Sequence, residues 1–417
     1  WDQTKEGNPP DGFYFGTEYT KEDINRAINE NDRTLSTDEV GSGTLLSGIC
    51  AGLGRSNPTY EGVAKDSELI VIKLGTIDGK YNNAYYYVAR DYARTKARDL
   101  ERPLIINKSV GTNNDVGFIN RATQSTIWYQ YGECEIAGIG NEGNTQTHAS
   151  GKISTEGETQ TVEIEIEEEE EFLKIELWIC RPDRVNIKII SPTGEESKDV
   201  GLGYYKNESG IFNFENTTYT VFYVFPTSYS GQEFIIINLY NASPGIWKIN
   251  LTGVYINSGC YNVYLPNRSL INQNTRFLEP DPFYTVNFPT VDRNIFTVGA
   301  YDMINNSMWP PSSRGPNIRN IQKPNIVAPG VNIISAYPHN RYGNITGTSA
   351  AAAVTSGVAA LFLQYVTQNN QYKRQGFTQS IYSFFQLGAD REDNIQYPNF
   401  IYGYGLLNAR KIFEEFR

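Results

Sequence analysis

One serine stands where a hydroxyl could act as a nucleophile. Ser349 follows Gly347 and Thr348 and begins an Ala-rich apolar stretch, which predicts a long helix over residues 349–366. The N–H groups and the dipole at a helix N-terminus favour negative charge, such as develops on a carbonyl oxygen under nucleophilic attack. Serine and threonine also favour helix starts as capping residues, so Ser349 alone has two interpretations.

An asparagine provides a second group for the same chemistry. Asn141 lies in a Gly-rich turn directly after the apolar segment 136–140, which predicts a buried strand. Its side-chain amide could donate a hydrogen bond to an oxyanion formed at Ser349. Gly-rich turns that join strands to helices are common, so this segment alone is also a weak signal.

Alternating strands and helices predict a sheet that would position these groups. A helix with one apolar face is predicted over residues 82–100, between two short apolar runs. The predicted buried strands are residues 69–74, 104–106, 136–140, 295–300 and 332–336. Strand, helix and strand at these lengths favour βαβ units and a parallel sheet.

The middle of the chain has a different pattern, with short strand-like runs separated by turns. These runs are residues 161–166, 172–179, 185–190, 219–224, 234–239, 247–251 and 261–265. Many short strands with few helices are typical of an antiparallel sandwich of the jelly-roll type. We therefore predict an α/β domain with a mainly parallel sheet flanked by helices, formed by residues 1–156 and 267–417. The inserted antiparallel jelly-roll β-sandwich would be residues 157–266.

Composition limits the class of protein. The chain has 417 residues, and 36 Lys plus Arg against 47 Asp plus Glu give a net charge of −11, which argues against a nucleic-acid partner. No apolar run reaches the roughly 18 residues of a membrane span, and the N-terminus shows no signal peptide. The cysteines are predicted to be buried reduced thiols that bind no metal; they are Cys50, Cys134, Cys180 and Cys260.

Four ordered segments together resemble one family, the subtilisin-like serine proteases (subtilases). The segments are residues 41–52, 106–111, 138–144 and 347–354. Residues 313–316 and 403–405 also match positions of that family, and the resemblance covers nearly all of the chain outside the insertion. It implies a subtilisin-like fold and an acyl-transfer site. Ser349 would occupy the nucleophile position and Asn141 the oxyanion position.

The resemblance also implies where an extended substrate would bind. Ser109, Val110 and Gly111 match the edge segment that pairs with a substrate through backbone hydrogen bonds. The segment Gly138, Ile139 and Gly140 would form the other wall of the specificity pocket.

The first motif departs from the family at its general base. The family's Gly-His-Gly-Thr is here Gly41-Ser42-Gly43-Thr44, and a hydroxyl cannot accept a proton near pH 7. The two histidines, His148 and His339, stand elsewhere and are predicted to be surface residues. Lys108 could in principle form a Ser–Lys dyad, but we favour an exposed lysine at a strand end.

Several features resemble the Csp branch of the family, the germination-specific subtilases of clostridial spores. They are residues 1–4, 15–20 and 140–144, Ala353 in place of a proline, and the inserted sandwich. Some members of that branch have lost catalytic residues and act as pseudoproteases that sense germinants. The family's triad aspartate, in an Asp-Ser/Thr-Gly turn, would precede Trp1, so we expect a processed or partial product.

The resemblance and the missing base predict a catalytically inactive regulator of spore germination, located in the cortex or coat region of the bacterial spore. The expected partners are its own prodomain or upstream segment, another Csp-type protein, or a small germinant. No cofactor or metal is expected, although many subtilases carry structural calcium. Two alternatives stay open. One is an active endopeptidase that processes a cortex-hydrolase precursor, with His339 or Lys108 as the base, and the other is a structural spore protein.

Overall fold

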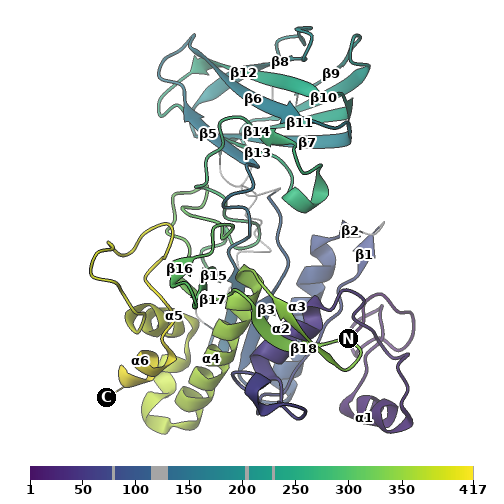
Figure 1. The fold of residues 1–417 in the computed structure, drawn as a ribbon, viewed down its shortest axis with the longest axis vertical. Helices are drawn as coiled ribbons and strands as arrows, with labels where there is room; N and C mark the ends of the chain where they lie inside the picture. Colours follow the sequence, from purple (N-terminus) through teal and green to yellow (C-terminus); the bar gives the residue numbers. More distant parts are fainter. Residues whose placement is uncertain (78–79, 114–129, 202–205, 228–230, 417) are drawn as a thin grey trace.

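The molecule has two parts that follow each other along its long axis (Figure 1). The computed structural model describes residues 1–77, 80–113, 130–201, 206–227 and 231–416. A β-sandwich lies at one end, and an α/β part that contains both chain termini lies at the other. Loops and extended segments connect the two parts.

A five-stranded mixed sheet forms the centre of the α/β part. Strands β3, β4, β15 and β17 run parallel, and β16 is antiparallel to β15. Their bounds are β3 (Leu104–Lys108), β4 (Glu133–Gly138), β15 (Phe296–Asp302), β16 (Ser307–Met308) and β17 (Ile326–Pro329). Because parallel strands end at the same edge of a sheet, the segments that follow β3, β4 and β17 lie close together.

Helices cover both faces of this sheet. The helices are α1 (Lys21–Glu30), α2 (Ser42–Ala51), α3 (Asn83–Asp99), α4 (Thr348–Gln368), α5 (Thr378–Leu387) and α6 (Ala409–Glu414), with 3-10 turns Pro58–Tyr60, Arg268–Leu270 and Asn370–Gly376. Alternate residues of β4 face opposite layers: Cys134 and Ile136 join the core with α4 and α5, whereas Glu133 and Glu135 form ion pairs with α3. Two hairpins complete this part: β1 (Thr76–Ile77) with β2 (Lys80–Tyr81), and β18 (Ile333–Tyr337) with β19 (Arg341–Ile345).

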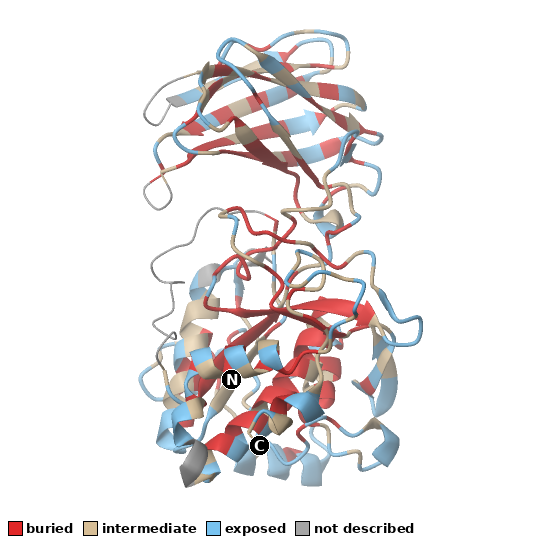
Figure 2. Cartoon of the chain, turned by 90° about the vertical axis from the view of Figure 1, so that its left-hand side faces the viewer, coloured by how far each residue is buried: buried red, intermediate tan, exposed pale blue. Residues whose placement is uncertain are grey.

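Helix α4 is the central helix of the α/β core. Figure 2 shows buried residues concentrated in the sheet and in the inner helix of this part. By length and by its mean hydropathy of 1.5, α4 could cross a membrane, but 67% of that stretch is buried inside the protein. Its residues Ala351, Ala359 and Phe362 pack against β4, β15 and α5, as expected for the core helix of a globular domain.

The sandwich consists of two antiparallel sheets. The six-stranded sheet has the order β5-β13-β7-β11-β10-β9, and the four-stranded sheet has the order β14-β6-β12-β8. Their bounds are β5 (His148–Lys152), β6 (Thr159–Ile166), β7 (Glu170–Ile179), β8 (Arg184–Ile190), β9 (Lys206–Phe212), β10 (Thr217–Val224), β11 (Glu233–Ala242), β12 (Gly245–Tyr255), β13 (Cys260–Tyr264) and β14 (Arg276–Phe277). The paired strands of the sandwich thus extend from His148 to Phe277, beyond both ends of the insertion that the sequence predicted at residues 157–266.

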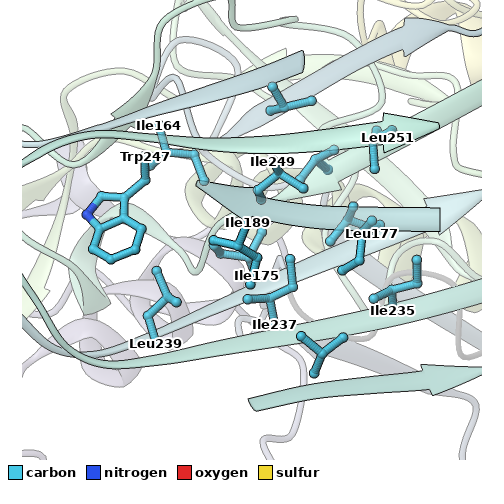
Figure 3. Close-up of a cluster of buried hydrophobic side chains, with 14 of the residues drawn as sticks. Ile164, Ile175, Leu177, Ile189, Ile235, Ile237, Leu239, Trp247, Ile249 and Leu251 are labelled. Carbon is cyan, nitrogen blue, oxygen red and sulfur yellow. The ribbon is translucent and has the colours of Figure 1, made fainter. Parts of the chain in front are cut away.

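Alternate side chains of both sheets fill the sandwich interior. Ile164 of β6, Ile237 of β11 and Trp247 of β12 lie in this cluster and are at most 1% exposed (Figure 3). A separate cluster joins the sandwich to the α/β part: Trp178 and Phe234, on the outer face of the six-stranded sheet, pack with Ile139 just after β4. The sandwich therefore contacts the segment that carries Asn141.

The structure contradicts the prediction of a buried strand at residues 69–74. Leu69 and Val71 are 52% and 58% exposed, and this segment forms no strand. Lys73 of this segment forms an isolated parallel β-bridge with Asp2. Within the described residues no sheet strand covers this run, so its apolar composition did not lead to burial.

The prediction that all four cysteines stay reduced is also wrong. Cys180 and Cys260 form a disulfide, while Cys50 and Cys134 are free. Although the two residues are 80 positions apart in the sequence, β7 pairs with β13, which brings their Cα atoms to 5.4 Å. That separation lies within the usual range for a bridged pair.

Candidate functional site

The start of α4 places Ser349 at the strand-end edge of the sheet. Gly347 precedes the helix with φ of 151°, and its N–H donates to the carbonyl of Gly330, just after β17, at 2.8 Å. Ser349 is half-buried, and its hydroxyl has no hydrogen-bond partner within the described residues. The N–H groups of Thr348 and Ala350 in the first turn of α4 are used within the protein, so among the described residues the N–H of Ser349 is the one left to stabilise an oxyanion there.

Asn141 is held beside the same helix start. Its Oδ1 accepts hydrogen bonds from the N–H and the hydroxyl of Thr348, at 3.1 and 3.0 Å. A Cβ built on Gly347 would lie 3.3 Å from Asn141 Nδ2. Because an amide has separate donor and acceptor ends, occupation of the oxygen leaves the NH2 group free to donate toward an oxyanion at Ser349.

Two hydroxyls that the sequence interpretation did not assign fix the turn that carries Asn141. The Thr348 hydroxyl accepts from Gly140 N–H at 3.2 Å. Ser313 is fully buried; its N–H donates to the carbonyl of Gly140 at 2.9 Å, and its hydroxyl accepts from Glu142 N–H at 3.0 Å. Both residues lie within segments that matched the family pattern, which was the available signal, but their contacts require the fold.

Ser42 is the first residue of α2, which packs against α4. Cys50 Sγ lies 3.3 Å from the carbonyl of Ala353, and Leu46 and Ile49 of α2 share a buried cluster with Ala350 and Ala353, near the start of α4. Ser42 is exposed, and its hydroxyl makes no hydrogen bond to any residue that the structure describes.

Asp38 stabilises the start of α2 in place of a capping residue. Its carboxylate accepts from Gly41 N–H at 2.7 Å and from the N–H and hydroxyl of Thr44 at 2.8 Å each. Burial alone would raise the pKa of Asp38, but the hydrogen bonds from Thr44 and Gly41 outweigh it and hold the pKa below its ordinary value. Asp38 is therefore ionised at neutral pH, and its two oxygens are occupied by hydrogen bonds from Gly41 and Thr44.

Neither histidine can serve as the base for Ser349. The prediction of a surface residue is wrong for His148, which is 2% exposed in β5. Its Nδ1 lies 2.9 Å from the carbonyl of Asp281 and its Nε2 lies 3.0 Å from Asn262 Oδ1, so both ring nitrogens are occupied. His339 is exposed at the tip of the β18–β19 hairpin, about 14 Å from the end that leads into α4.

Lys108 is buried, which contradicts the prediction of an exposed strand-end lysine. Its ammonium forms an ion pair with Glu135 and lies 4.8 Å from the centre of the Tyr86 ring. Burial opposes the charged form, but the Glu135 carboxylate outweighs burial and raises the pKa of Lys108. A lysine base must be neutral, so this geometry argues against the Ser–Lys dyad.

The two predicted walls of the specificity pocket differ in accessibility. Ser109 and Gly111 are exposed after β3, and Val110 is half-buried. On the other wall Gly138 and Gly140 are half-buried, but Ile139 is fully buried. The N–H of Ile139 donates to the carbonyl of Val298 at 2.9 Å, and its carbonyl accepts from Asn287 N–H at 3.0 Å. Ile139 therefore contributes packing rather than free backbone groups.

Among the described residues, Asn141 Nδ2 and the N–H of Ser349 remain as donors to an oxyanion, while the ring nitrogens of His148 and the ammonium of Lys108 are occupied by other groups. The family resemblance assigns the position of the general base to Ser42, whose hydroxyl cannot accept a proton near pH 7. Across the described ranges, no set of three or more His, Cys, Asp or Glu side chains is arranged to hold a metal ion.

Comparisons with known proteins bear on the family and the fold. A sequence profile of the Subtilase family matches residues 11–166 and 267–405, well over half of the chain. Serine protease AprX of Bacillus subtilis is 34% identical over 145 residues, which are 30% of this chain and 31% of AprX. Subtilisin DY of Bacillus licheniformis is 31% identical over 126 residues, 30% of this chain and 39% of that protein. The matched stretches thus span less than two-fifths of these relatives.

One solved structure matches both parts of the molecule. The structure of the Clostridium perfringens CspB protease superposes with a TM-score of 0.88 and covers 96% of this chain and 85% of CspB, at 24% sequence identity. At that identity the likeness shows a common fold.

Proposed function

This chain belongs to the subtilase family, and we propose that it is a catalytically inactive member, a pseudoprotease that regulates spore germination. The observation that carries the proposal is the exposed hydroxyl of Ser42 at the position of the general base, while the ring of His148 is hydrogen-bonded elsewhere and His339 lies at the exposed tip of a hairpin. Removing the triad histidine lowers the turnover of a serine protease by about 10⁶-fold. An intact oxyanion site cannot compensate for a loss of that size.

The retained parts of the site support binding rather than turnover. Asn141, Thr348 and Ser313 keep the geometry of an oxyanion site, and the exposed Ser109–Gly111 segment offers a backbone edge. An extended peptide segment could pair with that edge through main-chain hydrogen bonds. We therefore propose that the protein binds a segment of a related Csp protein at this site, or responds to a small germinant in the spore cortex or coat region.

The sandwich fits the jelly-roll class in this proposal. Successive strands β5, β6, β7 and β8 alternate between the two sheets, and β11, β12, β13 and β14 alternate in the same way. This pattern supports a jelly roll. Its contact with Ile139 would allow the sandwich to influence the segment that carries Asn141.

A peptidase assay on the full-length protein tests the proposal. We expect no cleavage of casein or of fluorogenic peptides by the unaltered protein. Cleavage that disappears on Ser349→Ala would overturn the proposal. A partner assay complements it: the full-length protein should retain a co-expressed Csp-type protein, and Ser109→Pro, which blocks the backbone edge, should weaken the retention.

An active endopeptidase is the second candidate, because the Ser349 hydroxyl makes no hydrogen bond to any described residue and Asn141 Nδ2 could donate to an oxyanion beside it. Ser42→His in the full-length protein distinguishes the two candidates. Cleavage that appears only in this variant supports the inactive regulator, whereas equal cleavage with and without the substitution supports the enzyme.

A further inference from the structure

The outer face of the six-stranded sheet carries a row of exposed side chains at one end. Phe172 of β7 and Tyr240 of β11 lie directly opposite each other, and their ring centres are 5.3 Å apart. Thr218 of β10 and Ile211 of β9 continue the row across the sheet. Phe172, Tyr240 and Ile211 are 47%, 39% and 50% exposed. The row therefore presents two aromatic rings and an aliphatic side chain to solvent.

The other end of this face is covered. Trp178, about 20 Å further along β7, packs there with Phe234 against the α/β part. The outer face of the four-stranded sheet instead carries cross-strand ion pairs, such as Lys248 with Glu163 at 2.8 Å. A solvated sheet face normally has such polar side chains. An apolar row that continues a buried interface and stays uncovered indicates a contact surface for a partner.

The residues beside this row set the charge that a partner must have. The exposed residues around the turn from β6 to β7 are acidic: Glu167, Glu168, Glu169 and Glu171. Within the part of the chain that the structure describes, these four carboxylates form no ion pair, although the nearby Glu165 pairs with Arg276. Like charges this close repel one another, and basic groups of a partner would relieve the repulsion.

The same charge disfavours a second copy of this chain as the partner. A two-fold contact places identical surfaces against each other. It would bring two acidic runs together on molecules that each carry a net charge of −11. Juxtaposed like charges weaken such a contact, so the row fits a different, basic partner better.

A cavity of about 250 Å³ lies beside the acidic run. It is lined by Glu168, Ile271, Asn272, Gln273 and Asn274. Cavities that hold drug-sized ligands have about 300–1,000 Å³, so this one suits a single side chain. A carboxylate and amides next to an isoleucine match a lysine or arginine, which combines an apolar stem with a charged head.

The segment that lines this cavity also reaches the backbone edge at Ser109–Gly111. Asn113, just after that edge, donates its N–H to Asn267 Oδ1 at 2.9 Å. Leu270, in the turn that follows Asn267, is 67% exposed. The chain between the edge and the cavity thus adds another exposed apolar side chain.

We propose that the Phe172–Tyr240 row and the acidic run at residues 167–171 form a docking surface for a protein partner that presents basic side chains next to apolar ones. The rings bury the apolar side chains of the partner, and the glutamates neutralise its basic ones. This inference rests on the proposed binding of a related protein, and it names the surface on this chain that recognises it.

Synthetic peptides provide the test. The probes are fluorescein-labelled heptapeptides of alternating Lys and Leu, alternating Glu and Leu, and alternating Lys and Ser. With the full-length protein, fluorescence anisotropy should give about tenfold tighter binding for the Lys–Leu peptide than for either of the others. Its affinity should fall at high salt, because exposed charges are then screened.

Substitutions in the row locate the binding. Phe172→Ser with Tyr240→Ser should weaken binding of the Lys–Leu peptide about tenfold. Ile246→Ser is the matched control, since Ile246 is 42% exposed and lies on the outer face of the other sheet. The control variant should bind the peptide as the unaltered protein does.

Substitutions in the acidic run test the charge separately, and they decide the proposal if the double variant of the row fails to fold. Conversion of Glu168, Glu169 and Glu171 to Gln should also weaken binding about tenfold and should remove most of its salt dependence. The control converts three exposed glutamates far along the chain, Glu6, Glu22 and Glu30, to Gln. It removes the same charge and should leave the affinity unchanged.

The outcomes separate this inference from the proposed function. Equal Kd values for the Lys–Leu and Glu–Leu peptides, no binding at millimolar concentration, or binding that neither set of substitutions weakens would overturn the docking surface and leave the inactive-regulator proposal standing. A dimer in sedimentation that Phe172→Ser with Tyr240→Ser dissociates would identify a second copy as the occupant and also overturn it. Cleavage of casein that requires Ser349 would instead refute the inactive regulator without touching the peptide result.

Discussion

The oxyanion side and the base side of the site use their polar groups in different ways. On the oxyanion side, Thr348 bonds Asn141 and Gly140 and holds the donor amide in place. On the base side, Asp38 binds the start of α2, while Ser42, which the family resemblance assigns to the position of the general base, bonds to none of the described residues. The comparison teaches that a neighbouring carboxylate can hold a helix start whatever side chain occupies the first residue of the helix. If the proposed loss of activity is real, it therefore does not require loss of fold.

The largest expected effect lies beneath the oxyanion side, at the buried Lys108–Glu135 pair. Lys108→Met leaves the Glu135 carboxylate with only Arg94 and Arg90 nearby, at 3.3 and 4.0 Å. The free energy of unfolding should fall by about 3 kcal/mol, because removal of one partner leaves a buried charge poorly compensated. Urea denaturation measures this change.

A second substitution provides the control for Lys108. The double variant Lys108→Met with Glu135→Leu should recover most of the lost stability, since it removes both charges. A single variant as stable as the unaltered protein would show that the buried pair has no such role.

The next effect is on the oxyanion side itself. Thr348→Val keeps the shape but removes the hydroxyl that donates to Asn141 Oδ1 and accepts from Gly140 N–H. We expect a loss of about 1–3 kcal/mol and faster hydrogen exchange at the Gly140 amide. Thr367→Val, on the same helix, is the control, because that hydroxyl donates only to carbonyls of its own helix. Unchanged exchange at Gly140 would argue against this anchoring.

A smaller effect is expected at the cap on the base side. Asp38→Ala removes the acceptor for Gly41 and Thr44 and should cost about 0.5–2 kcal/mol at pH 7. Because the folded protein holds the pKa of Asp38 below its ordinary value, its contribution is present above the unfolded pKa of about 3.9 and is lost as pH falls further. Thermal denaturation should therefore show a difference between the two proteins at pH 7 that shrinks toward pH 3. A difference that grows on acidification would refute this account.

The smallest effect is expected at Ser42. Ser42→Ala should change the free energy of unfolding by no more than about 0.5 kcal/mol, because the side chain is exposed. A loss larger than that of Asp38→Ala would show that Ser42 has a structural or binding role that its contacts do not reveal.

The periodicity of apolar residues and the order of the motifs predicted many of the helices and strands. The Ala-rich stretch predicted a helix over residues 349–366, and α4 spans Thr348–Gln368. The strand-like run at residues 161–166 predicted a strand, and β6 spans Thr159–Ile166. Local patterns of this kind depend on residues that are close in the sequence, so one sequence is enough to detect them.

The features that the sequence did not predict depend on contacts between residues that are far apart in the sequence. Lys108 is buried because Glu135, from the neighbouring strand, neutralises it. His148 is buried because Asn262 and Asp281, more than a hundred residues away, meet its ring. The Cys180–Cys260 bridge likewise needs the strand order, which composition and spacing do not supply.

The most direct test of the central claim is the reaction of Ser349 with a fluorophosphonate probe, followed by intact mass and peptide mapping of the unaltered full-length protein. A serine without a general base should react no faster than the same protein after denaturation, so the account predicts no adduct above that background. Rapid, stoichiometric labelling of Ser349 that denaturation abolishes would contradict it.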